Sequence, residues 1–282
     1  CEYNDTLTLQ KIAKIINGAF SVVYDKDYII NELAFDSRKI QHEANTLFFA
    51  LTSEKTDGHK YIKELYEKNI RKFVVKDSFN DIHTYPDANF IQVNNTLIAL
   101  QTLANHHRHN FSIPVIGITG SNGKTAVKEW LFQLLCDDYR IAYTPNSFNS
   151  QIGVPLSIWN INEDTQLGIF EAGISKPDEM NTLKEIIDPT IGILTNIGTA
   201  HDEYFMDVKQ KIGEKLNLFR NVDTLIYCID NGLITEVIMR TELTKKIKLF
   251  RWSRKKEDSD LFIESIVKQS KYTEITACFN KQ

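Results

Sequence analysis

The segment Pro114–Trp130 carries residue types that suit the binding of nucleotide phosphates. It reads PVIGITGSNGKTAVKEW, with glycines at 117, 120 and 123 followed by Lys124 and Thr125. A lysine and a hydroxyl at the start of a helix, preceded by glycines, can contact the β- and γ-phosphates and a bound Mg²⁺. The common phosphate-loop pattern requires glycine at position 118, where this chain has Ile118. The dinucleotide pattern Gly-x-Gly-x-x-Gly does not fit either. The alternative to a phosphate-binding loop is a strand-to-helix turn with a surface lysine.

Three more residues with useful chemistry follow apolar runs or lie in helical segments. Glu171 ends LGIFEAG, His201 follows ILTNIGTA, and Lys215 lies in KQKIGEKLNLF. A carboxylate at the carboxyl end of a strand beside the phosphate-loop strand is where ATPases hold Mg²⁺. Taken singly, the three are also compatible with a solvated glutamate, a structural histidine and a solvent-facing helical lysine.

The elements that must position these residues follow an α/β pattern with two domains, at residues 1–110 and 111–282. In the first, LTLQKIAKIING predicts a short helix that Thr8 caps and Gly18 ends, among further short strands and helices. From about residue 113, short apolar runs alternate with helical segments, which predicts βαβ units and a mostly parallel sheet flanked by helices. The alternation in DLFIESIVKQSKYTEITACFN predicts a β-hairpin.

The composition excludes some classes of function. The chain has 282 residues, 42% of them hydrophobic, and a net charge of -4, which does not favour nucleic-acid binding. Its apolar runs are too short to span a membrane, and the N-terminus lacks the features of a signal peptide. Four scattered cysteines favour a reduced, cytoplasmic protein, with Cys136 and Cys228 expected in the core. The run HHRH at 106–109 is expected to be a polar helix end rather than a metal site.

Together, the segments GITGSNGKTAVKEWL, LGIFEAG and TNIGTAH resemble the Mur ligases, ATP-dependent amide-forming enzymes of peptidoglycan synthesis. That family has a shortened loop, Gly-Ser/Thr-x-Gly-Lys-Thr/Ser, which accommodates Ile118. The resemblance implies ATP contacts from Gly120, Ser121, Asn122, Gly123, Lys124, Thr125 and Asn231, the last in IDNGLI. It implies two Mg²⁺ ions, held by Thr125, Glu171, His201 and a Lys215 carbamylated by CO₂. The catalytic residues would be Lys124, His201 and Lys215.

The first domain, with FDSRKIQHEANTLFFALTSEKTDGHKYI, resembles the UDP-sugar-binding domain of the tripeptide-adding and D-alanyl-D-alanine-adding members. The resemblance implies contacts to the UDP-substrate from Ser37, Arg38, Asp57, Gly58, His59 and Asn149, the last in NSFNSQIGVPLSIW. The chain departs from the family at Ser150, where a second asparagine is usual, and at Glu43-Ala44, where Pro-Gly is common.

Within the family, the segments are most similar to the branch that adds D-alanyl-D-alanine to UDP-MurNAc-tripeptide through an acyl phosphate. They are particularly similar to the ligase part of bacterial fusions that carry an alanine racemase. We expect a monomeric N-terminal fragment that lacks the C-terminal ligase domain and cannot complete ligation alone. The alternatives are a diamino-acid-adding Mur ligase, an enzyme similar to folylpolyglutamate synthase, or a P-loop module that binds nucleotide without catalysis.

Overall fold

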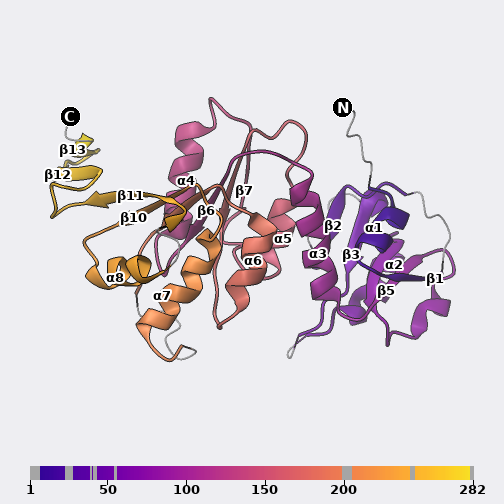
Figure 1. Ribbon diagram of the computed structural model, residues 1–282. Coiled ribbons are helices and arrows are strands. Elements are labelled where there is room, and N and C mark those ends of the chain that lie inside the picture. Colours follow the sequence, from indigo (N-terminus) through magenta and orange to yellow (C-terminus); the bar gives the residue numbers. More distant parts are fainter. Residues whose placement is uncertain are drawn as a thin grey trace. The chain divides into compact units, whose positions relative to one another are not determined.

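Two separate β-sheets organise the chain (Figure 1). The computed structural model describes residues 7–22, 28–38, 40, 43–53, 56–198, 205–241 and 245–279. The chain folds into two compact units, Cys1–Asn110 and Phe111–Gln282, and each unit contains one of the sheets.

The sheet of the first unit has five strands in the order β1-β5-β4-β3-β2. Strand β1 pairs antiparallel with β5, and the other pairs are parallel. The strands are β1 (Ala19–Val22), β2 (Glu32–Ala34), β3 (Thr46–Phe49), β4 (Lys72–Lys76) and β5 (Asn89–Val93). The α-helices are α1 (Leu9–Ile15), α2 (Ile62–Glu67) and α3 (Thr96–His109), and 3₁₀-helices span Glu43–Asn45, Gly58–Tyr61 and Asp81–Thr84.

Strand β3 is buried along its whole length because side chains cover both of its faces. One face packs into a cluster that joins Phe48, Phe73 and Phe90 to Ile62 and Leu65 of α2. The predicted first helix is confirmed: the Thr8 side chain accepts a hydrogen bond from the backbone N–H of Lys11. Figure 1 shows β3 and its neighbours between the helices of this unit.

The sheet of the second unit has eight strands in the order β13-β12-β11-β10-β9-β6-β8-β7. The strands are β6 (Val115–Thr119), β7 (Ile141–Tyr143), β8 (Leu167–Glu171), β9 (Ile191–Leu194), β10 (Thr224–Cys228), β11 (Lys248–Ser253), β12 (Leu261–Lys268) and β13 (Thr273–Phe279). The helices are α4 (Lys124–Leu135), α5 (Gly153–Ile158), α6 (Glu179–Ile187), α7 (Val208–Leu216) and α8 (Gly232–Arg240). All pairs are parallel except β12–β13, which confirms both the mostly parallel sheet and the final hairpin.

The order of the strands reverses at β6, which lies between β8 and β9. From β6 the sheet extends through β8 to the edge strand β7 on one side and through β9, β10 and β11 on the other. In open α/β sheets, ligands bind outside the carboxyl ends of the strands at such a reversal. The glycine segment leaves the carboxyl end of β6 and therefore occupies the expected position for a ligand site.

The two faces of this sheet take alternate residues of each strand. Ile116 and Ile118 of β6 pack with Leu167 and Ile169 of β8 on the face that α4 covers through Val127 and Leu131, among others. Gly117 and Gly192 face the opposite side. An added Cβ would meet Pro189 and Leu218 at Gly117, and Phe219 at Gly192. Because Glu171 has the same parity as Ile169, its side chain belongs to the α4 face.

The two cysteines expected in the core are less buried than their apolar surroundings in the sequence indicate. Cys136 is exposed, so its assignment to the core is wrong. Helix α4 ends at Leu135 and turns Val127, Leu131 and Leu135 inward, which leaves Cys136 outside that stripe. Cys228 is half-buried.

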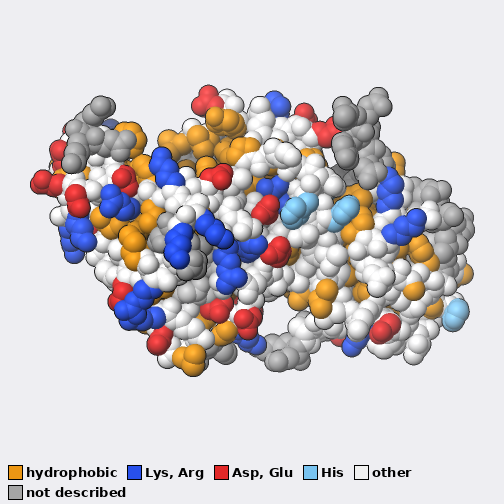
Figure 2. Space-filling model, in the orientation of Figure 1, with side chains coloured by type: hydrophobic (Ala, Val, Ile, Leu, Met, Phe, Trp, Pro, Cys, Tyr) orange, Lys and Arg blue, Asp and Glu red, His pale blue; other side chains and the backbone are white. Residues whose placement is uncertain are grey.

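The run at 106–109 forms the last turn of α3, as predicted, although Arg108 within it is buried. No helix among the described residues is long and apolar enough to cross a membrane. On the face drawn in Figure 2, acidic and basic side chains are interspersed rather than separated by sign.

Candidate active site

The glycine segment forms a loop that only particular residues can adopt. Gly120 has a φ of 147°, and a Cβ there would lie 1.9 Å from Oγ1 of Thr195. Gly123 has a φ of 82° and immediately precedes α4, and a Cβ there would meet nothing within 4 Å. The first turn of a helix has backbone N–H groups without partners inside the helix, so this open loop end suits an anion.

Two residues of the loop after β9 hold the glycine loop in place. The side-chain oxygen of Asn196 accepts a hydrogen bond from the backbone N–H of Asn122 at 2.9 Å. The backbone carbonyl of Asn196 accepts from the backbone N–H of Ser121 at 2.7 Å. The Thr195 hydroxyl donates to the carbonyl of Asn122 at 2.7 Å. Neither Thr195 nor Asn196 was predicted from the sequence, although their place at the carboxyl end of the strand beside β6 could have indicated them.

Lys124 and Lys215 come together at the backbone carbonyl of Gly120. Nζ of Lys124, in the first turn of α4, donates to this oxygen at 3.0 Å, and Nζ of Lys215, in the last turn of α7, donates to it at 3.2 Å. The two residues are 91 positions apart (215 − 124). The structure therefore places both predicted lysines on one side of the loop.

Lys215 is buried, with 4% of its surface exposed. Burial lowers the pKa of its amine to about 7, with further contributions from the charges of Lys124 and Lys211. Burial also lowers the pKa of Lys124, against the opposing attraction of the Glu171 carboxylate. Near neutral pH, a substantial fraction of Lys215 is thus an uncharged amine, which is the nucleophilic form.

Thr125 and Glu171 form an oxygen-rich pair beside the loop. The Thr125 hydroxyl lies 3.2 and 3.1 Å from the two carboxylate oxygens of Glu171, which is fully buried at the end of β8. A hydroxyl and a carboxylate are oxygen ligands of the kind that Mg²⁺ prefers, so these residues fit the predicted ion. The described residues contain no group of three or more His, Cys, Asp or Glu side chains suited to a metal.

Two cavities adjoin the loop. The smaller, of about 160 Å³, is lined by Gly120, Ser121, Lys124, Asn149, Ser150, Gly173, Ile174, Ser175 and Lys215. It brings Asn149 to the same space as the two lysines. The larger, of about 740 Å³, includes Asn122, Gly123, Asn231 and Trp252 in its lining.

The larger cavity has the size and composition of a small-molecule site. Trp252, Val127 and Ile193 provide apolar walls next to the polar end of the loop. The Asn231 side chain caps α8 by accepting from the backbone N–H groups of Leu233 and Ile234. A nucleotide contact from Asn231 stays a prediction, and His201 lies outside the described residues.

The remaining predicted residues belong to the first unit. Arg38 is exposed and forms a two-point pair with Asp36, at 2.9 and 2.8 Å, which raises the pKa of the guanidinium. Its backbone N–H also bonds to Asp36, and Ser37 between them is half-buried. The pair presents the guanidinium in a fixed position while leaving part of its donor set available.

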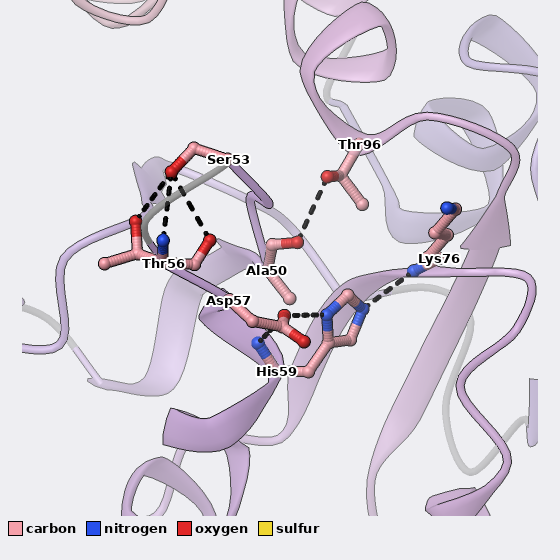
Figure 3. A network of polar contacts seen from close by, with 7 residues as sticks. All are labelled: Ala50, Ser53, Thr56, Asp57, His59, Lys76 and Thr96. Carbon is pink, nitrogen blue, oxygen red and sulfur yellow. Dashed lines mark hydrogen bonds and ion pairs between the residues drawn. The ribbon is translucent and has the colours of Figure 1, made fainter.

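Asp57, Gly58 and His59 form a hydrogen-bonded turn, and Figure 3 draws the side chains of Asp57 and His59. Asp57 accepts from the backbone N–H of His59 at 3.0 Å and bonds to Nδ1 of its ring at 2.6 Å. The other ring nitrogen, Nε2, accepts from the backbone N–H of Lys76 at 3.0 Å. Burial opposes the charge on Asp57, but the bonds from His59 outweigh it and lower the pKa of the carboxyl.

The side chains of this turn differ in how much of their hydrogen-bonding capacity is already used within the chain. Both ring nitrogens of His59 are used within the chain, and the ring stacks on Phe79. The Asp57 side chain is 62% exposed. A Cβ on Gly58 would lie 2.8 Å from the backbone nitrogen of Leu51, so the turn requires glycine. Of the side chains in this turn, that of Asp57 is therefore the more exposed polar group.

Comparison with known proteins gives two family matches. Residues 118–282 match the Mur ligase middle domain, and residues 29–108 match the Mur ligase family, catalytic domain. The UDP-N-acetylmuramoyl-tripeptide--D-alanyl-D-alanine ligase of Bacillus subtilis (strain 168) is 31% identical over 235 residues, which cover 80% of this chain and 50% of that protein. The chain thus spans about half the length of the curated relatives it matches.

Solved structures show a similar fold. MurF from Acinetobacter baumannii has a TM-score of 0.82 at 23% identity, covering 96% of this chain and 58% of that one. MurF ligase from Thermotoga maritima, in complex with ADP, has a TM-score of 0.76 at 23% identity, covering 91% of this chain and 58% of that one. At these identities, the likeness concerns the fold.

Proposed function

This chain belongs to the Mur ligase family, and we propose that it provides the UDP-substrate and ATP sites of a D-alanyl-D-alanine-adding ligase. The whole enzyme would use ATP to join D-alanyl-D-alanine to the terminal carboxylate of UDP-MurNAc-tripeptide. One observation carries this proposal. Lys124, Lys215, the Thr125–Glu171 pair and Asn149 converge on one loop at the carboxyl end of β6.

The proposed reaction has two steps. A carboxylate oxygen of the UDP-substrate attacks the γ-phosphorus of ATP, the bond to the β-phosphate oxygen breaks, and ADP leaves. The amine of D-alanyl-D-alanine then attacks the acyl carbon, phosphate leaves, and the amine nitrogen loses a proton. The first step is needed because a carboxylate is a poor electrophile, whereas an acyl phosphate has a good leaving group.

The residues of this chain would act mainly by position and charge. The backbone N–H groups at the start of α4 and the ammonium of Lys124 hold the phosphates and offset their negative charge. Thr125 and Glu171 hold Mg²⁺, which supplies further positive charge when it is bound. Asn149, on the wall of the small cavity, orients the acceptor substrate.

Carbamylation of Lys215 forms part of the proposal. The uncharged amine adds to CO₂, and loss of a proton leaves a carbamate, which converts a cation into an anion. The lowered pKa of Lys215 and its contact with Gly120 support this, because the amine is buried beside two other lysines and disfavours its own charge. A carbamate there would add negatively charged oxygens beside Lys124 and the glycine loop.

Calorimetric titration of this chain tests the assignment. We expect binding of ATP with Mg²⁺ and separate binding of UDP-MurNAc-tripeptide. UDP-MurNAc-dipeptide, the acceptor of a diamino-acid-adding ligase, and a folylpolyglutamate serve as comparison ligands. Stronger binding of either comparison ligand would reassign the substrate. If the chain binds ATP but none of the UDP-linked ligands, it is a nucleotide-binding module instead.

A further inference from the structure

Lys128 is a fully buried lysine one helical turn after Lys124, and the proposed mechanism does not use it. Its Nζ donates to the backbone carbonyl of Thr144 at 2.7 Å and to that of Asn146 at 2.5 Å. It also lies 2.9 Å from a carboxylate oxygen of Glu129. An ammonium has three N–H groups, so these three acceptors match its complete set of donors.

The two carbonyls belong to a turn that leaves the end of β7. Asn146 in this turn has a φ of 49°, in the left-handed region that residues other than glycine rarely adopt. The surrounding structure must therefore hold the turn in place. Lys128 provides this restraint directly, because it binds the carbonyl of the left-handed residue itself.

The same turn leads to Asn149 on the wall of the small cavity. The carbonyl of Asn149 accepts from the backbone N–H of Gly173 at 2.8 Å. A Cβ on Gly173 would lie 2.8 Å from Oδ1 of Asn149, so this side chain packs closely against the backbone that follows β8. The segment 144–149 is thus held by Lys128 of α4 at Thr144 and Asn146, by β8 at Thr144, and by Gly173 at Asn149.

The bonds of Lys128 distinguish this role from that of a simple countercharge for Glu171. Its Nζ is 3.8 Å from the nearest carboxylate oxygen of Glu171, beyond hydrogen-bonding distance. The carboxylate instead accepts from the Thr125 hydroxyl. The directed bonds of Lys128 all go elsewhere, two of them to the turn.

We propose that Lys128 is a positioning residue that fixes the turn Thr144–Asn146 to α4 and so places Asn149 at the acceptor side of the nucleotide site. The consequence for substrate binding rests on the proposed function, whereas the restraint of the turn does not. Through this restraint, the helix that follows the phosphate loop also sets the geometry of the opposite cavity wall.

The test compares Lys128→Met with the unaltered chain in three measurements. Hydrogen exchange at the amides of Phe148 and Asn149 should accelerate about tenfold or more, because these amides bond within the released segment. Affinity for UDP-MurNAc-tripeptide should fall about tenfold, within the range seen when supporting residues of a site are removed. Affinity for ADP, measured in EDTA so that Mg²⁺ does not contribute, should stay within about threefold.

Two further variants sharpen the comparison. Glu129→Gln keeps an acceptor beside Lys128 and should behave as the unaltered chain in all three measurements. Lys128→Gln keeps an N–H donor for one carbonyl and should give intermediate exchange rates.

Unchanged exchange at Phe148 and Asn149 in Lys128→Met would overturn the proposal. Equal losses of ADP and acceptor binding, or unfolding of both Lys128 variants, would overturn it as well, because either result assigns Lys128 a general structural role. If the unaltered chain does not bind UDP-MurNAc-tripeptide, the proposed function fails. The exchange measurement then still decides whether Lys128 restrains the turn.

Discussion

Replacing Lys215 by methionine should make the stability of the second unit less dependent on pH above neutrality. The pKa of this buried amine is about 7, against 10.5 for an unperturbed lysine. Between these two values the unfolded chain binds a proton that the folded chain does not, so unfolding becomes harder as the pH rises. The contribution is lost below pH 7, where both states are protonated and the folded state carries a buried charge.

The magnitude follows from the size of the shift. A difference of about 3.5 pKa units (10.5 − 7) corresponds to about 5 kcal/mol over the whole range, at about 1.4 kcal/mol per unit. Between pH 7 and pH 9 the native chain should gain about 2 kcal/mol from Lys215, as an order of magnitude. Lys215→Met lacks this gain, so the difference in unfolding free energy between the two proteins should change by that amount.

Urea unfolding followed by tryptophan fluorescence measures this difference. The three tryptophans of the chain, Trp130, Trp159 and Trp252, all lie in the second unit, so the signal reports that unit. Buffers free of CO₂ keep Lys215 as an amine. Lys209→Met, which removes an exposed lysine from the same helix, is the matched control and should follow the unaltered chain. Identical pH dependence in Lys215→Met and the unaltered chain would refute the reasoning.

Three shorter predictions concern the other site residues. Lys124→Met should weaken ATP binding about tenfold or more in a calorimetric titration, because it removes a charge-assisted bond to the phosphates; unchanged affinity would exclude a phosphate contact. Glu171→Gln should reduce the gain in ATP affinity that Mg²⁺ provides by about tenfold or more while leaving ATP binding in EDTA unaltered; equal losses with and without Mg²⁺ would argue against a metal ligand. Gly58→Ala should destabilise the first unit by about 1 to 3 kcal/mol, because its Cβ would press on the backbone of Leu51. Faster hydrogen exchange in β3 measures that loss, and unchanged exchange would contradict it.

Local patterns predicted the elements well because their causes are local. The Thr8 cap, the parallel strands and the final hairpin each follow from residue types a few positions apart. Cys136 shows the limit of this reasoning, because its burial depends on where α4 ends relative to the sheet. An apolar run alone does not determine which side of a helix end faces inward.

Side-chain partners distant in the sequence were harder to predict. Lys128 follows Gly-Lys-Thr at a spacing that would suit an exposed helical lysine, yet two of its three acceptors lie 16 and 18 residues away in a turn. Asn196 supports the glycine loop from 74 residues away. His59 was predicted from a motif to contact substrate, and this contact stays a prediction; its ring nitrogens bond to Asp57 and to the backbone of Lys76, which the motif did not indicate. Motifs indicated where these residues matter, and the fold determines which atoms remain available.

The shared carbonyl of Gly120 has a consequence for how this site can evolve. Lys124 and Lys215 both donate to this oxygen, so a change at either lysine alters the hydrogen bonding of the other. The effects of substituting the two lysines should therefore not add in a double-mutant cycle. Gly120 cannot readily change to relieve the pair, because a Cβ there would overlap Thr195. The loop and Lys215, although distant in the sequence, are thus energetically coupled through one backbone oxygen.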